Sequence, residues 1–258
     1  MGTAFRMTRR SGLLRILFVA VFLLLNFAGE LPAADESIVR KSAVQIMRDY
    51  FTEQKYDMAL AASAAALAEQ PDSYLVHNML AYIHWQGAEW DKMLASAEKA
   101  LKIKDKDAEM LLLAGRARYM KKEYASAAET LENAFIAGER MNIRNPEICF
   151  DLAAAYVQLN QYEKAIEWAQ KAVSLDPGFA TAHYVLGRTY FEAGKFAESV
   201  PNFLKSLELK ESLTGVREYL GLAYAKSGDR EKARQTFQEI LKNDPDNKTA
   251  KENLAALQ

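Results

Sequence analysis

One spacing dominates this sequence, because the same residue types recur thirty-four positions apart. The clearest columns are Leu152, Leu186 and Leu220; Tyr156, Tyr190 and Tyr224; and Ala165, Ser199 and Ala233. A period of this length is typical of stacked helical hairpins, each of which is too small to bury its own apolar face. The spacing therefore predicts an all-α solenoid rather than a domain with a single central core.

The same period continues upstream with one interruption. Tyr56, Trp90 and Tyr124 are in register, but the step from Tyr124 to Tyr162 is four residues longer. We place the insertion in Ile136–Asn145 and expect it to lengthen either the second helix of the third hairpin or the loop that follows it. The repeats begin near Arg40, Tyr74, Ala108, Pro146, Ala180 and Thr214. We therefore divide the array into repeats 1–3 (residues 40–145), repeats 4–6 (146–247) and a capping helix (248–258).

The residue types at these positions suit closely packed helix pairs. Leu152, Ala153 and Tyr156 fall at helical spacing on one face of a first helix. Small residues at Ala165 and Ala169 mark the matching stripe of a second helix, where they let two backbones approach. The C-terminal segment carries a one-sided apolar stripe of Ala250, Leu254 and Leu257, which predicts a helix that closes the stack.

The best copy of the motif is Leu220-Gly221-x-x-Tyr224, followed by Gly228, Ala233, Phe237 and Pro245. Leu186-Gly187-x-x-Tyr190 matches nearly as well. The pattern resembles the tetratricopeptide repeat family, and the resemblance extends from about Arg40 to the C-terminus. It implies an α-solenoid of six helical hairpins plus the capping helix, wound as a right-handed superhelix.

The N-terminal residues have the pattern of an export signal. Four arginines, ending at Arg15, precede an apolar run from Ile16 to Leu25 that is short for a membrane span. Small residues, Ala33 and Ala34, follow before Asp35. We predict a signal peptide over residues 1–34, or an uncleaved anchor, and a short linker over 35–39. An exported bacterial protein of the periplasm is expected in the first case, and an inner-membrane anchor facing the periplasm in the second.

The composition limits the classes of partner. Half of the residues are hydrophobic and about a quarter are charged, which is normal for a folded helical protein. The formal net charge is −1, and the residues after position 34 alone carry about −4, because the first 34 hold four arginines and one glutamate. This balance gives no basic footprint for nucleic acid.

The candidate reactive side chains fall in packing positions of the repeat. His77, His183 and the single cysteine, Cys149, all occupy the fourth column, counted from the start of each repeat, and His84 occupies the eleventh. Both columns call for a packed ring or similar bulk, so we interpret all four as structural. No catalytic motif, metal signature or phosphate-binding loop is present in the sequence, and we expect neither an enzyme nor a cofactor.

The resemblance also implies where a partner binds. In related repeats, columns two, five, six, nine, twelve and thirteen of the first helices line a concave groove that holds a peptide or a helix. We predict the groove residues to be Arg48, Phe51, Asn78, Tyr82, Trp85, Leu112, Arg116, Tyr119, Phe150, Tyr184, Arg188, Phe191 and Tyr219. Aromatic residues and arginines are typical of interaction hot spots.

Two interpretations of these side chains stay open. Each aromatic ring either contacts a partner or packs between neighbouring first helices. For the arginines of column nine, Arg48, Arg116 and Arg188, the groove is favoured because an ionised guanidinium avoids a packed seam.

One subtype of the family grips a chaperone's C-terminal carboxylate through lysine and asparagine side chains in fixed columns. Val44, Met79 and Glu109 occupy such columns here, so that subtype is disfavoured. We predict a non-catalytic scaffold that binds a protein or peptide of a bacterial envelope complex. The alternatives are a self-assembling structural protein, for which a homo-oligomer is possible, and a small-ligand-binding accessory subunit of an envelope transporter.

Overall fold

The computed structural model describes residues 41–210, 212 and 215–257. The predicted signal peptide (1–34) and linker (35–39) lie outside these residues. Residues Ser42–Gln258 form one compact unit. Its described part contains thirteen helices and no strand: α2 (Ala43–Thr52), α3 (Tyr56–Glu69), α4 (Tyr74–Gln86), α5 (Trp90–Ile103), α6 (Ala108–Met120), α7 (Tyr124–Arg140), α8 (Pro146–Gln158), α9 (Tyr162–Leu175), α10 (Ala180–Glu192), α11 (Phe196–Leu209), α12 (Val216–Ser227), α13 (Arg230–Asn243) and α14 (Lys248–Ala256).

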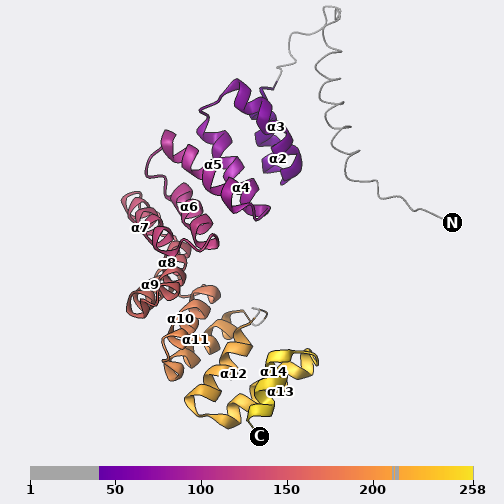
Figure 1. The fold of residues 1–258 in the computed structure, drawn as a ribbon, viewed down its shortest axis with the longest axis vertical. Coiled ribbons are helices and arrows are strands. Elements are labelled where there is room, and N and C mark those ends of the chain that lie inside the picture. Colours follow the sequence, from indigo (N-terminus) through magenta and orange to yellow (C-terminus); the bar gives the residue numbers. More distant parts are fainter. Residues whose placement is uncertain (1–40, 211, 213–214, 258) are drawn as a thin grey trace, which may run out of the picture. The chain divides into compact units, whose positions relative to one another are not determined.

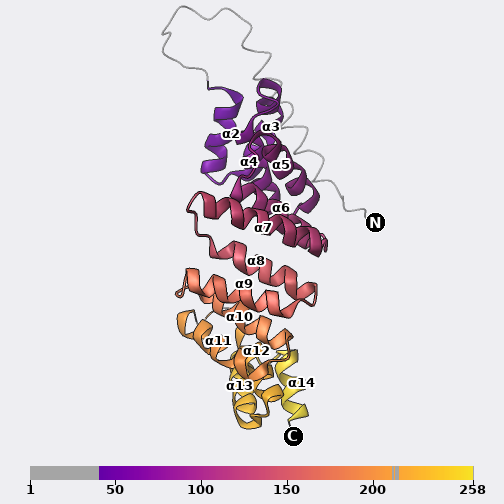
Figure 2. The same cartoon turned by 90° about the vertical axis from the view of Figure 1, so that its left-hand side faces the viewer.

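Consecutive helices pair into hairpins, from α2 with α3 to α12 with α13, and each hairpin packs on the next (Figure 1). Within this array every first helix also contacts the first helix of the following hairpin, such as α6 with α8. Figure 2 shows the same order of stacking from the side. The prediction of an all-α solenoid of helical hairpins is confirmed.

In three hairpins a glycine of the first helix faces a large side chain of the second helix: Gly115 faces Leu131, Gly187 faces Phe203 and Gly221 faces Phe237. Gly187 on α10 faces Phe203 on α11 so closely that an added Cβ atom would lie 2.8 Å from the ring. Where the first helix has the larger Ala153, the second helix carries Ala169 in the same buried cluster. A larger residue at one of the two positions is therefore accompanied by a smaller residue at the other, because the two helices keep a close spacing.

At three repeat boundaries, a polar residue at the end of one repeat caps the helix that follows: Asp107, Asn145 and Asn247. Oδ1 of Asp107 accepts hydrogen bonds from the backbone N–H groups of Glu109 and Met110, both at 3.1 Å. Asn145 caps α8 in the same way, through the N–H of Glu147 at 2.9 Å. These bonds satisfy donors that a helix start leaves unpaired, so they stabilise the starts of these helices.

The insertion after repeat three lengthens both the helix and the loop. Helix α7 has 17 residues, whereas α5 and α9 have 14. The chain then turns back, with the N–H of Ile143 donating to the carbonyl of Gly138 at 2.8 Å. The loop that follows brings Ile143 and Asn145 beside the first helices, where they line the cavity described below.

Helix α14 closes the C-terminal end of the array. Its Ala250 is fully buried, and it joins Leu257, Phe237 and Ile240 in one apolar cluster. None of the helices in the described residues is long and apolar enough to cross a membrane.

Candidate functional site

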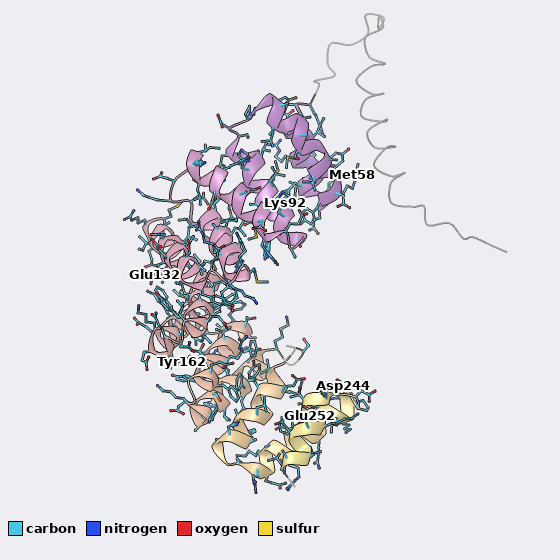
Figure 3. All side chains as sticks on the ribbon, in the orientation of Figure 1. Met58, Lys92, Glu132, Tyr162, Asp244 and Glu252 are labelled. Carbon is cyan, nitrogen blue, oxygen red and sulfur yellow. The ribbon has the colours of Figure 1, made fainter. Side chains whose placement is uncertain are left out.

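Three adjoining cavities lie along the first helices α4, α6, α8 and α10, with volumes of about 500, 410 and 270 Å³. The first and second share Trp85, Arg116 and Glu147 in their walls. The second and third share Phe150 and Asp151, among others. We call the three together the first-helix groove. Glu132 on α7 and Tyr162 on α9, both labelled in Figure 3, belong to second helices and line none of these cavities.

Most of the predicted binding residues line this groove. They are Tyr82, Trp85, Leu112, Arg116, Tyr119, Phe150, Tyr184 and Arg188. The others are Arg48, Phe51, Asn78, Phe191 and Tyr219, which line none of the three cavities. The structure therefore brings together eight predicted residues of repeats two to five, whereas Asn78 and Phe191 of these repeats and the predicted residues of repeats one and six lie outside the cavities.

Several predicted rings pack between neighbouring first helices. Phe51 on α2 meets Tyr82 on α4 edge-on, with ring centroids 6.3 Å apart. Phe191 on α10 meets Tyr219 on α12 in the same manner at 5.5 Å. Asn78 donates to the hydroxyl of Tyr74 on its own helix at 3.4 Å. Such contacts bury aromatic surface inside the array, so these side chains contribute to helix packing.

Arg116 is held by two carboxylates of the next repeat. Its Nε donates to Oδ2 of Asp151 at 2.6 Å, and its Nη2 donates to Oε2 of Glu147 at 2.7 Å. The guanidinium also lies over the rings of Trp85 and Phe150, 5.5 and 6.0 Å from their centroids. Only 16% of the Arg116 side chain is exposed. This arginine therefore links α6 to α8, because both of these hydrogen bonds are donated to carboxylates within the protein.

The repeat register explains why the three predicted arginines differ. The ion pairs join column nine of repeat three to columns two and six of repeat four. Beside Arg188, the corresponding residues of the next repeat are Gly215 and Tyr219, and its guanidinium lies over the Tyr219 ring, 5.7 Å from the centroid. Beside Arg48 they are Leu75 and Met79, and Arg48 is exposed. Only Arg116 finds acidic partners in both columns.

Burial raises the pKa of the Asp151 carboxyl group to about 6, although Arg116 acts in the opposite direction. Burial also raises the pKa values of Tyr119 and Tyr184 in the groove. The nearby guanidinium of Arg188 opposes this effect, but both pKa values stay above their ordinary value. The pKa of Tyr82 is raised as well, first by burial and then by the hydrogen bond that its hydroxyl donates to the carboxylate of Glu109. The groove is therefore a partly dehydrated surface in which charges interact strongly.

The raised pKa of Asp151 predicts how the stability depends on pH. The unfolded carboxyl has a pKa of about 3.9, so between the two values the folded chain binds more protons. This group favours folding fully below the unfolded pKa, and that contribution is lost as the pH rises through about 6. From about pH 4 to about pH 7, we expect the free energy of unfolding to fall by about 2 kcal/mol relative to Asp151→Asn. Urea unfolding of both proteins across this range measures the difference; a gap that stays constant or widens toward neutral pH contradicts the expectation.

Sequence reasoning missed the acidic side chains of the groove. Glu109, Glu147, Asp151 and Glu192 all line it, as do Trp90 and Phe179. The four carboxylates occupy columns two, six and thirteen, which the family resemblance already names as groove positions. The repeat register was therefore the signal that could have found them, whereas a search for hot-spot residue types passed over them.

The residues interpreted as structural are packed. Cys149 is fully buried, and His77 and His84 are 4% and 7% exposed. Burial raises the pKa of the Cys149 thiol to about 11, which keeps it protonated and unreactive. His183 is half-buried, and its Nε2 hydrogen-bonds the carbonyl of Pro177 at 3.1 Å. The interpretation of these residues as packing positions is confirmed for Cys149, His77 and His84.

Comparison with known proteins identifies the repeat. Models described as "TPR repeat" or "Tetratricopeptide repeat" match residues 153–194, 180–213 and 216–247. Over 119 residues, 46% of this chain, the sequence is 31% identical to small glutamine-rich tetratricopeptide repeat-containing protein 2 of Mycosarcoma maydis, covering 32% of that protein. It is 26% identical over 140 residues, 54% of this chain, to the BBSome complex member BBS4 of Bos taurus, covering 26% of it. The chain thus spans about a third or less of these relatives.

Solved structures share the fold along most of their length. PilW, described as a widely conserved type IV pilus biogenesis factor, superposes with a TM-score of 0.73 at 20% identity, over 82% of this chain and 96% of PilW. YrrB, described as a TPR protein with an unusual peptide-binding site, gives 0.59 at 24% identity, over 74% and 97% of the two chains. MamA gives 0.57 at 25% identity, over 64% and 95%.

Proposed function

We propose that this chain of tetratricopeptide repeats is a non-catalytic scaffold that binds an extended peptide or a helix of a partner protein in the first-helix groove. The observation that carries the proposal is the groove itself, which is continuous over four first helices and lined by Trp85, Tyr119, Phe150 and Tyr184. Aromatic side chains on a rigid helical framework provide large contact areas at a small entropic cost. YrrB, which shares the fold, is itself described as having a peptide-binding site.

The scaffold is proposed to act in the bacterial cell envelope. Support comes from the basic residues and apolar run at the N-terminus, which have the pattern of an export signal, cleaved or retained as an anchor. PilW, a pilus biogenesis factor, has the same fold. The partner is then a protein or peptide of an envelope complex.

The peptide-binding function is tested with the full chain and a random peptide library. Peptides selected on the wild type are measured again on Trp85→Ala/Phe150→Ala, and we expect their affinity to fall by about tenfold or more, because both rings face the groove. The control is Ile136→Ala/Leu204→Ala, which removes two side chains, 48% and 46% exposed, from second helices. Circular dichroism checks that both variants keep their helix content. If the groove and control variants bind the peptides equally well, the groove is not the binding site.

A further inference from the structure

The charges that line the first-helix groove do not balance. Its walls hold four carboxylates, from Glu109, Glu147, Asp151 and Glu192, and two guanidiniums, from Arg116 and Arg188, but no lysine. Arg144 lies in the loop between Ile143 and Asn145 but lines none of the three cavities. The formal charge of the lining is therefore negative, although the predicted groove residues included three arginines and no acidic residue.

The excess charge is concentrated where the cavities meet. One guanidinium, that of Arg116, serves both Asp151 and Glu147. Within the described residues, hydrogen bonds reach one oxygen of each of these two carboxylates, Oδ2 of Asp151 and Oε2 of Glu147, and none reaches the second oxygen of either. The side chain of Asp151 is 15% exposed and that of Glu147 is 46% exposed. The second oxygen of each carboxylate remains accessible from the groove, and a donor that carries positive charge would bind it more strongly than a neutral donor.

Apolar rings surround these carboxylates. Trp85, Trp90, Tyr119, Phe150 and Phe179 line the same cavity of about 410 Å³. The face of an aromatic ring attracts a cation, as the position of Arg116 over Trp85 and Phe150 already shows. The combination suits a side chain with an apolar stem and a cationic head.

The remaining charged side chains of the groove leave its lining negative overall. Arg188 lies one helical turn from Glu192 on α10, and the two interact electrostatically. Glu109, at the other end of the groove, accepts a hydrogen bond from the hydroxyl of Tyr82, a donor that brings no positive charge. An acidic residue therefore stands at each end of the groove as well as in its middle.

We infer that the first-helix groove selects partner segments that place a lysine or arginine among aliphatic residues, with the cationic head received by Asp151 and Glu147. This inference rests on the proposed function, because it names the class of peptide that the same groove takes. Electrostatic complementarity of this kind contributes mainly to specificity and to the rate of association.

The test uses three fluorescein-labelled peptide pools of one length, in which leucine and alanine are interspersed with lysine, glutamine or glutamate. On the full chain we expect the lysine pool to bind about tenfold more tightly than the glutamine pool, because charged hydrogen bonds replace neutral ones. Added salt should weaken the lysine pool and leave the glutamine pool nearly unchanged. The glutamate pool should bind most weakly.

Two charge-neutralising variants test which groove carboxylates cause the preference for the lysine pool. Glu147→Gln/Glu192→Gln should remove most of the tenfold difference, and Glu109→Gln/Glu192→Gln, which leaves the ion pairs of Arg116 intact, should reduce it. The control Glu129→Gln/Glu163→Gln changes the net charge equally at exposed positions of α7 and α9 and should keep the difference. Equal loss in the control would overturn the inference, because it would assign the preference to the overall charge of the chain.

The outcomes separate this inference from the proposed function. If the glutamine pool binds as tightly as the lysine pool and both depend on Trp85 and Phe150, peptide binding stands and the charge preference is overturned. If the glutamate pool binds best, Arg188 sets the specificity and the inference is wrong. If no pool depends on these rings, the proposed function fails first. Self-association that the same carboxylate variants abolish would assign the groove to a second copy of this chain, which also overturns the inference.

Discussion

Replacement of Arg116 with alanine is expected to lower the free energy of unfolding by about 3 kcal/mol. The variant leaves Asp151 and Glu147 without their shared guanidinium, and Asp151 is the more buried of the two. Loss of one partner from a buried ion pair is costly because the remaining charge keeps its desolvation penalty. Urea denaturation followed by circular dichroism measures the change.

Arg188→Ala is the matched control, since it removes the same residue type from the same repeat column. Arg188 stacks on Tyr219 and forms no ion pair within 4.0 Å among the described residues, so we expect a loss nearer to 1 kcal/mol. Combining Arg116→Ala with Asp151→Asn should recover part of the stability, because the uncompensated carboxylate is then gone. Equal losses for Arg116→Ala and Arg188→Ala would show that the double ion pair contributes nothing.

Replacement of Gly187 with alanine should destabilise the array by about 2 kcal/mol through overpacking. The new Cβ atom would lie 2.8 Å from Cδ1 and Cε1 of Phe203, and that ring is fully buried. Neither the ring nor the helix can move without a further cost in free energy, because the neighbouring hairpins pack against both. The midpoint of thermal or urea unfolding reports the loss.

Gly178→Ala is the control for this variant, because its Cβ would meet only the carboxylate oxygen of Asp176 at 3.4 Å, an ordinary contact. The double variant Gly187→Ala/Phe203→Leu should be more stable than Gly187→Ala alone, since the smaller side chain makes room for the methyl group. A double variant that is no better than Gly187→Ala would show that the cost does not arise at this contact.

Much of the fold could be predicted because each repeat encodes its own hairpin. Small residues at Gly187 and Ala153, and caps such as Asn145, act between helices that are neighbours in sequence. The choice between a longer helix and a longer loop at Ile136–Asn145 could not be made in advance. The helix propensity of a few residues competes there with the loop that packs Ile143 beside α8, and both effects are of similar size.

The candidate site, like the fold, could be predicted from the sequence only in part. Many residues in the columns that the family register names line the cavities, yet the register did not distinguish Arg116 from Arg188, because both occupy column nine. The difference arises from the neighbouring repeat, where Glu147 and Asp151 stand beside one arginine and Gly215 and Tyr219 beside the other. Likewise, whether a ring such as Phe51 faces a partner or a neighbouring helix depends on the side chains across that contact.

The sequence by itself determined the repeat, the hairpins and the register of their columns, because these follow from local spacing along one helix pair. Only the tertiary structure decided which groove charges are paired within the protein and which are not. The guanidinium of Arg116 is bound by carboxylates more than thirty residues away in the chain, within 2.7 Å in space. That distance depends on how adjacent repeats stack, and the balance of charge in the groove follows from it.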